Sequence, residues 1–152
     1  MEALQRVAQF MEQLPFKLEI ITFDESTHTA QLAADALGVK EAQIAKTLVF
    51  IGKTKSVLVV TSGDQKVDQK KLKQLTEEKM KFANEEQVFN LTGFAPGGVC
   101  PFGIKELMPI FIDISLKRFD VVYAAAGTPK SAVPVTVAQL VAATGGELVD
   151  VC

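Results

Sequence analysis

The feature that most constrains the fold is a pair of apolar runs in the first half of the chain. Residues 44–51 read IAKTLVFI and residues 56–61 read SVLVVT, while the four residues between them are small or polar. Both runs are rich in β-branched residues, which is typical of strands that are buried. We therefore expect a β-hairpin that turns at Gly52 to Lys55 and lies at the centre of a sheet.

Segments with helical spacing or helix-capping residues are distributed along the whole chain. Helices are predicted at residues 2–13, at 29–38, after Asp68, at 84–93 and at 136–143. In the helix after Asp68, we expect Leu72 and Leu75 to be buried.

Further strands are predicted between and beyond these helices. They fall at residues 16–23, 110–114 and 121–125, around Val133 and around Leu148. This order mixes hairpin-like neighbours with intervening helices, which favours an α+β fold with a mixed sheet over a regular doubly wound fold.

The chain length indicates one domain. At 152 residues the chain has room for little more than one core, so we expect residues 1–152 to form a single unit. Hydrophobic residues make up 48% and charged residues 22%, the balance of a globular domain and not of a disordered chain.

The net charge is small but unevenly placed along the chain. A formal charge of -2 is unfavourable for gripping a long nucleic-acid backbone, so a DNA-reading protein is not expected. Residues 40–81, however, hold ten lysines against five acidic residues. This segment either contacts phosphate or forms an ordinary solvated surface, and the sequence leaves both open.

Cysteine and histidine are too few for a metal or disulfide framework. With two cysteines and one histidine we expect no metal, no cofactor and a reduced, cytoplasmic environment. Polar residues interrupt the N-terminal segment, and no run of about 18 apolar residues occurs, so neither a secretory signal nor a membrane span is predicted.

Lys46 is the first candidate functional residue. It interrupts a strand that otherwise reads as buried, so its side chain must either reach water or point into a polar pocket. An ammonium group in a pocket can neutralise charge that develops on a substrate oxygen.

The second candidate is the glycine-rich segment 94–103. Gly97 and Gly98 allow backbone amides to approach a ligand closely, and Pro101 stiffens the chain that follows. A structural turn explains the same residues equally well. Cys100 could also be a nucleophile with His28 as its base, but no spacing supports that pair, and a small residue that fills the loop is the simpler interpretation.

Several segments in order resemble one known family. The stretch TAQLAADALGVKEAQIAKTLVF is similar to the start of the YbaK/ProX aminoacyl-tRNA deacylases, and the likeness continues through VVTSGDQKVDQKKLKQL, FNLTGFAPGGVCPFGI and IDISL. The family includes free-standing proteins and a domain inserted into bacterial prolyl-tRNA synthetases. The resemblance implies an α+β domain with a mixed, partly barrel-like sheet flanked by helices.

The resemblance also implies a function, namely trans-editing hydrolysis of the ester between a wrongly attached small amino acid and tRNA, most often tRNA(Pro). The family's lysine falls on Lys46, and its substrate-binding glycine-to-proline loop falls on Gly97, Gly98, Val99, Cys100 and Pro101. The implied partners are the acceptor end of aminoacyl-tRNA and prolyl-tRNA synthetase. A non-catalytic module that binds aminoacyl-tRNA or a synthetase is the alternative.

The chain departs from the family pattern at two places. Family members that act on cysteinyl-tRNA carry a serine before an alanine-glycine pair, but the run here is Ala125, Ala126 and Gly127, and Cys100 stands where the loop often has serine. We expect Gly127 to contribute to substrate binding. The missing hydroxyl argues against an activity specific for cysteine. A pocket closed by small apolar residues would discriminate mainly by size, so the expected substrate is a small amino acid such as alanine or cysteine, without a choice between them.

Overall fold

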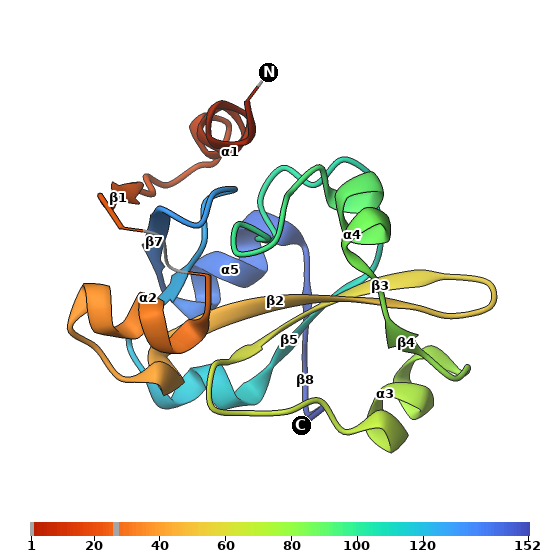
Figure 1. Ribbon diagram of the computed structural model, residues 1–152. Coiled ribbons are helices and arrows are strands. Elements are labelled where there is room, and N and C mark those ends of the chain that lie inside the picture. Colours follow the sequence, from red (N-terminus) through yellow and green to blue (C-terminus); the bar gives the residue numbers. More distant parts are fainter. Residues whose placement is uncertain (1, 26–27) are drawn as a thin grey trace.

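A computed structural model describes residues 2–25 and 28–152, which form an open, mixed β-sheet with helices packed around it (Figure 1). The strands are β1 (Ile21–Thr22), β2 (Ile44–Ile51), β3 (Ser56–Ser62), β4 (Lys81–Phe82), β5 (Ile110–Asp113), β6 (Val122–Ala124), β7 (Ser131–Val135) and β8 (Glu147–Val149). The helices are α1 (Ala3–Glu12), α2 (Ala30–Leu37), α3 (Gln69–Thr76), α4 (Glu85–Thr92) and α5 (Val137–Thr144), with short 3-10 helices η1 (Glu41–Gln43) and η2 (Ile114–Arg118).

The β2–β3 hairpin is the centre of the sheet, as the two apolar runs predict. The strands run in the order β1-β7-β6-β2-β3-β5-β8, and β4 is added to the far end of β2. β2 and β3 pair antiparallel from Ala45–Ser62 to Ile51–Ser56, whereas β6 joins β2 and β5 joins β3 in parallel. The predicted α+β class with a mixed sheet and flanking helices is confirmed, and the sheet does not close into a barrel.

The helix ends lie where the capping residues predict them. The side chains of Thr29, Asp68, Asn84 and Thr136 accept backbone N–H groups at the starts of α2, α3, α4 and α5. Gly38 and Gly93 adopt the left-handed conformation after α2 and α4, with φ of 71° and 79°. Local hydrogen bonding therefore fixes the helix boundaries around the sheet.

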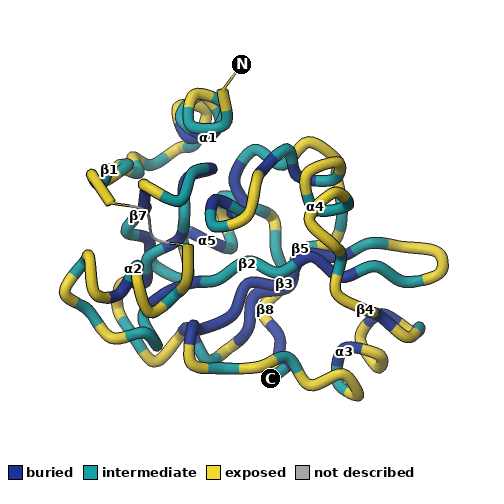
Figure 2. The backbone as a smooth tube through the Cα atoms, in the orientation of Figure 1, coloured by how far each residue is buried: buried dark blue, intermediate teal, exposed yellow. Residues whose placement is uncertain are grey.

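The buried residues form two apolar clusters, and the strands of the central hairpin contribute to both. One cluster brings Val49 and Leu58 together with residues of α1, α5 and the segment 94–104. The other joins Phe50, Val57 and Leu72, so that α3 covers it. Figure 2 shows that β3 is buried along nearly its whole length, as expected for the middle strand of the sheet.

Two expectations about the periphery are wrong. The strand predicted at residues 16–23 is reduced to β1, because only Ser131 and Ala132 of β7 pair with it at this edge of the sheet. Leu18 and Ile20 still pack against the core without being part of a strand. Leu75 is 37% exposed, because the short helix α3 turns only Leu72 and Thr76 inward.

The helices of the described residues are short. None of them combines the length and the apolar character that crossing a bilayer would require.

Candidate functional site

A cavity of about 260 Å³ lies beside the part of β2 that has no neighbouring strand on one edge. β6 pairs only with Ile44 and Ala45, while β4 pairs only with Phe50 and Ile51. The intervening residues 46–48 line the cavity, together with residues of α2, β6, β7 and the glycine-rich segment. The gap in strand pairing therefore gives a ligand access to the middle of the sheet.

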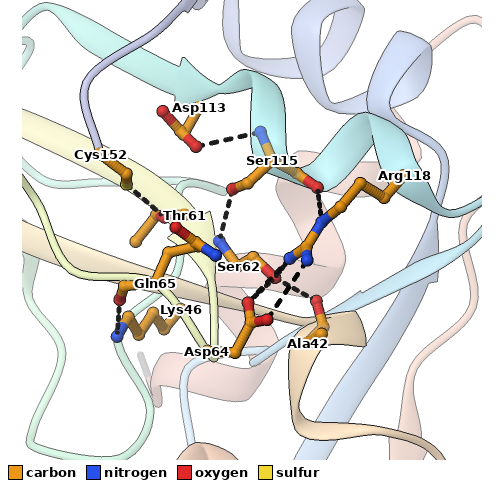
Figure 3. A network of polar contacts seen from close by, with 10 residues as sticks. All are labelled: Ala42, Lys46, Thr61, Ser62, Asp64, Gln65, Asp113, Ser115, Arg118 and Cys152. Carbon is orange, nitrogen blue, oxygen red and sulfur yellow. Dashed lines mark hydrogen bonds and ion pairs between the residues drawn. The ribbon is translucent and has the colours of Figure 1, made fainter.

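Lys46 is on this stretch, and its side chain is oriented by a single hydrogen bond. Its Nζ donates to the backbone carbonyl oxygen of Gln65 at 2.6 Å (Figure 3), and the residue is half-buried in the cavity wall. A lysine ammonium carries three N–H donors, so two of them remain for a ligand in the cavity. Lys46 is thus held in place without using its full capacity to bind an anion.

Thr47, the next residue along β2, carries an orphaned hydroxyl. Its Oγ1 is the one buried side-chain oxygen or nitrogen in the described part of the chain that has no hydrogen-bond partner. Thr47 also lines the cavity. The sequence gives no signal for this group, because threonine is ordinary in a strand.

The glycine-rich segment alternates between the cavity and the protein interior. Gly97 and Val99 line the cavity beside Lys46, whereas Gly98, Cys100 and Pro101 are buried. Gly97 has φ of 83°, and a Cβ there would lie 3.1 Å from His28 Nδ1, so glycine suits both the conformation and the close approach. The structure brings Lys46, Gly97 and Val99 together at one cavity.

Gly98 and Gly127 pack backbone against backbone, on the side of the loop that faces away from the cavity. A Cβ on Gly98 would lie 2.5 Å from the carbonyl oxygen of Gly127. Gly127 itself has φ of 92°, and a Cβ there would lie 3.1 Å from the backbone of Ala3. The structure therefore places Gly98 and Gly127 in the packing behind the cavity wall.

Cys100 lies in an environment that opposes thiolate chemistry. Its side chain is 0% exposed, and Sγ donates to the carbonyl oxygen of Phe102 at 3.6 Å. Burial raises the pKa of the Cys100 thiol to about 12. His28 lines the cavity, while Cys100 packs in the core cluster.

Arg6 of α1 is a residue that the sequence analysis missed. Its Nε donates to the carbonyl oxygen of Gly103 at 3.0 Å and its Nη2 donates to that of Thr92 at 2.9 Å, so it joins the two ends of the glycine-rich segment. The guanidinium also lies 4.5 Å from the ring centroid of Phe94. An arginine in a surface helix gives no signal of this role, because its acceptors are far away in the sequence.

Several alanines contribute to the remaining walls of the cavity, together with larger and polar residues such as Tyr123 and Ser131. Ala45, Ala124, Ala125 and Ala132 all contribute to it. Ala125 contributes a methyl group to the wall, at the position where the resemblance in the sequence suggests a serine in cysteine-specific family members. Among the described residues, no group of three or more His, Cys, Asp or Glu side chains is placed to hold a metal ion.

A comparison with protein families shows which family the chain resembles over most of its length. The model of the aminoacyl-tRNA editing domain matches residues 24–143. The chain belongs to this family. The resemblance to the YbaK/ProX deacylases inferred from the residues is thereby confirmed.

Individual relatives agree with this family. The editing domain is 35% identical to the uncharacterized protein YwhH of Bacillus subtilis (strain 168), over 99% of this chain and 97% of YwhH. It is 26% identical to a protein of Enterococcus faecalis named "Putative Cys-tRNA(Pro)/Cys-tRNA(Cys) deacylase EbsC", over 98% and 91% of the two chains. A proline–tRNA ligase of Bacillus licheniformis is 35% identical over 70% of this chain, which corresponds to 18% of the ligase.

Solved structures show the same architecture. A crystal structure described as "a putative trans-editing enzyme for prolyl tRNA synthetase" superposes with a TM-score of 0.93 at 36% identity, covering 99% of this chain and 97% of that one. The chain therefore shares its fold with a solved chain of similar length, and part of its sequence with a segment of a much larger proline–tRNA ligase.

Proposed function

We propose that this protein is a trans-editing hydrolase that cleaves the ester of a mischarged small amino acid from tRNA, with tRNA(Pro) as the expected carrier. The observation that carries the proposal is the shared cavity, in which an oriented ammonium group lies beside backbone that approaches closely through glycine. This arrangement suits an aminoacyl ester, whose carbonyl oxygen gains negative charge in the transition state.

Size supports the choice of a small amino acid. The cavity of about 260 Å³ is below the roughly 300–1,000 Å³ typical of sites for drug-sized ligands. Its alanines offer contact to a small aliphatic side chain, and polar residues such as Thr47 and Ser131 also line it. An aminoacyl group fits such a space, whereas the rest of the acceptor end must remain outside.

Catalysis in this proposal rests on positioning and electrostatics. The described residues that line the cavity include no carboxylate, and Cys100 is buried elsewhere with its pKa raised by desolvation. Water, or a group of the substrate itself, then attacks the carbonyl carbon. The bond between that carbon and the ribose oxygen breaks, and the leaving ribose oxygen takes up the proton that the nucleophile releases. Lys46 stabilises the oxyanion, and backbone groups of Gly97 to Val99 orient the ester.

The distribution of lysines supports contact with the tRNA backbone. Of the ten lysines in residues 40–81, all except Lys46 and Lys71 are exposed. Lys66 directly follows Gln65, the residue that accepts the hydrogen bond from Lys46. A local cluster of this kind is sufficient for an acceptor stem and does not require a strongly basic protein.

The test is a deacylation screen with the purified protein. tRNA(Pro) is charged separately with alanine, cysteine, serine or proline, and release of the amino acid is followed over time. We expect alanyl- or cysteinyl-tRNA(Pro) to be hydrolysed faster than prolyl-tRNA(Pro). Tight binding of the acceptor stem with no hydrolysis of any of the four would favour the non-catalytic binding module instead.

A further inference from the structure

A network of polar side chains lies next to Lys46 and connects the segment 62–65, which follows β3, to η2 (Figure 3). Gln65 accepts the hydrogen bond from Lys46 with its backbone carbonyl oxygen. The direction of the Lys46 ammonium therefore depends on where this segment holds that carbonyl group.

The segment is anchored to the sheet through its own backbone. Gly63 N donates to Ile44 O at 2.8 Å, and Gln65 N donates to Ser62 O at 3.0 Å. Ser62 Oγ donates to Ala42 O in η1. These bonds fix the start of the segment but leave Asp64 projecting from its tip, between Gly63 and Gln65.

Arg118 of η2 binds Asp64 at that tip through a bidentate ion pair. Its Nη2 and Nη1 lie 2.7 Å and 3.2 Å from the two carboxylate oxygens of Asp64. Its Nη2 also donates to Ser62 Oγ at 2.8 Å, and its Nε donates to Ser115 O at 2.8 Å. The guanidinium is therefore fixed on both sides, which gives the ion pair a defined direction as well as charge.

This pair contributes little to folding stability. The side chains of Asp64 and Arg118 are 37% and 43% exposed, and ion pairs in contact with water contribute little to the free energy of folding. The Arg118 guanidinium holds the pKa of Asp64 below its usual range, so the carboxylate stays charged near neutral pH. What the pair does fix is the position of the residue that precedes Gln65.

We propose that Asp64 and Arg118 are positioning residues, which hold the Gln65 carbonyl and thereby aim the Lys46 ammonium into the cavity. This inference rests on the proposed deacylase function and names the residues that adjust its catalytic lysine. Without the ion pair, Asp64 loses its contact with η2, while Ser62, two residues earlier, remains bonded to Ser115 and Arg118 of η2. The Gln65 carbonyl is then held less firmly, and Lys46 samples other directions.

The test uses Asp64→Ala, Arg118→Ala and the double variant. Because both changes break one unit, we expect each single variant to lower kcat on the preferred mischarged tRNA by about tenfold with KM nearly unchanged, and the double variant to lose no more than either single variant. Asp150→Ala is the matched control, because it removes the exposed Lys71–Asp150 pair at 3.0 Å. It should leave kcat unchanged.

A second readout does not depend on activity. In protein labelled with 13C at the lysine Cε, the Lys46 resonance is assigned from its loss in Lys46→Ala. We expect this resonance to shift and narrow in the Asp64 and Arg118 variants and to stay unchanged in Asp150→Ala. An unchanged Lys46 resonance in folded Asp64→Ala and Arg118→Ala protein overturns the positioning role, as does a kcat equal to that of the parent protein.

The two readouts separate this inference from the proposed function. If the parent protein hydrolyses none of the aminoacyl-tRNAs, the proposed function fails, and the resonance of Lys46 alone decides whether the ion pair positions it. If the parent protein is active and the variants lose activity without a change in that resonance, the pair acts on the fold and the positioning role is wrong.

Discussion

The two walls of the cavity are built by different means. On the β2 side, a charged side chain is oriented by a hydrogen bond, and neighbouring polar groups surround its acceptor. On the side of the glycine-rich segment, the position of Gly97 and Val99 depends on close backbone packing of Gly98 against Gly127. The first wall should therefore be sensitive to changes of charge, and the second to changes of volume.

This difference also separates activity from stability. Lys46 is half-buried and makes one described side-chain hydrogen bond, so the fold depends little on it. Gly98 is fully enclosed by backbone, so any added atom must displace the main chain. Variants of the β2 wall should therefore lower activity with little loss of stability, whereas variants of the glycine-rich wall should mainly lower stability.

Lys46→Ala should have the largest effect, and it should appear in catalysis. Loss of a group that stabilises an oxyanion typically lowers the rate by about 10²–10³-fold, and we expect a decrease of this size in kcat/KM for deacylation. The melting temperature should change little. Lys17→Ala, which removes an exposed lysine outside the segment proposed to contact tRNA, is the control and should retain most of the activity. Undiminished turnover by folded Lys46→Ala would show that Lys46 does not stabilise the oxyanion.

Gly98→Ala should act mainly on stability. The added methyl group would lie 2.5 Å from Gly127 O, and overpacking of this kind costs about 1–3 kcal/mol in the free energy of unfolding. Gly38→Ala is the control, because its φ of 71° is unfavourable for alanine while no atom lies within 4 Å of the new Cβ, so it reports backbone strain without overpacking. Gly98 is not among the glycines with positive φ, so its cost comes from the close contact. We expect urea denaturation to show a larger loss for Gly98→Ala. Equal losses would mean that the loop tolerates volume and that its close packing is not essential.

Most of the fold could be predicted because its signals are local. Strands β2 and β3 follow from continuous apolar runs, and the ends of α2 and α4 follow from Thr29, Asn84 and their glycine caps. The strand predicted at residues 16–23 is shortened to Ile21–Thr22, because pairing with β7 extends only over Ser131 and Ala132 although β7 itself runs to Val135. A sequence shows apolar alternation but not where pairing between two strands ends.

The candidate site shows the same limit. Lys46 and the glycine-rich segment are visible in the sequence because each breaks a local pattern, and their substrate-binding roles stay predictions. Arg6 was missed because its two acceptors are 86 and 97 residues away. Asp64 and Arg118, 54 residues apart, leave no local trace either. Contacts of this range appear only when the chain is folded.

Arg6→Lys should have an intermediate effect on both properties. Lysine keeps the charge but lacks the planar guanidinium with which Arg6 donates to Gly103 O and Thr92 O at the same time. The glycine-rich segment and the residues just before it are then held less firmly. We expect a loss of about 1–2 kcal/mol in the free energy of unfolding and a several-fold decrease in kcat/KM. Lys105→Ala, at an exposed position two residues beyond that segment, is the control. If both variants behave alike, the segment does not depend on α1.

Cys100→Ala should have the smallest effect on activity, with kcat within about twofold of the parent value, because the thiol is directed into the core.

Burial raises the pKa of the folded Cys100 thiol to about 12, whereas an unfolded thiol ionises near pH 8.5. The unfolded chain therefore loses this proton first as pH rises. The stability contributed by the neutral thiol is complete at pH 7 and is lost between about pH 8.5 and 12, by up to about 1.4 kcal/mol per pH unit. Urea denaturation at pH 8, 9 and 10 should show a steeper decline for the parent protein than for Cys100→Ala. If the free energies of unfolding of the two proteins decline in parallel, the Cys100 thiol ionises as easily in the folded state as in the unfolded state. Cys100 would then again be a candidate nucleophile in the glycine-rich segment.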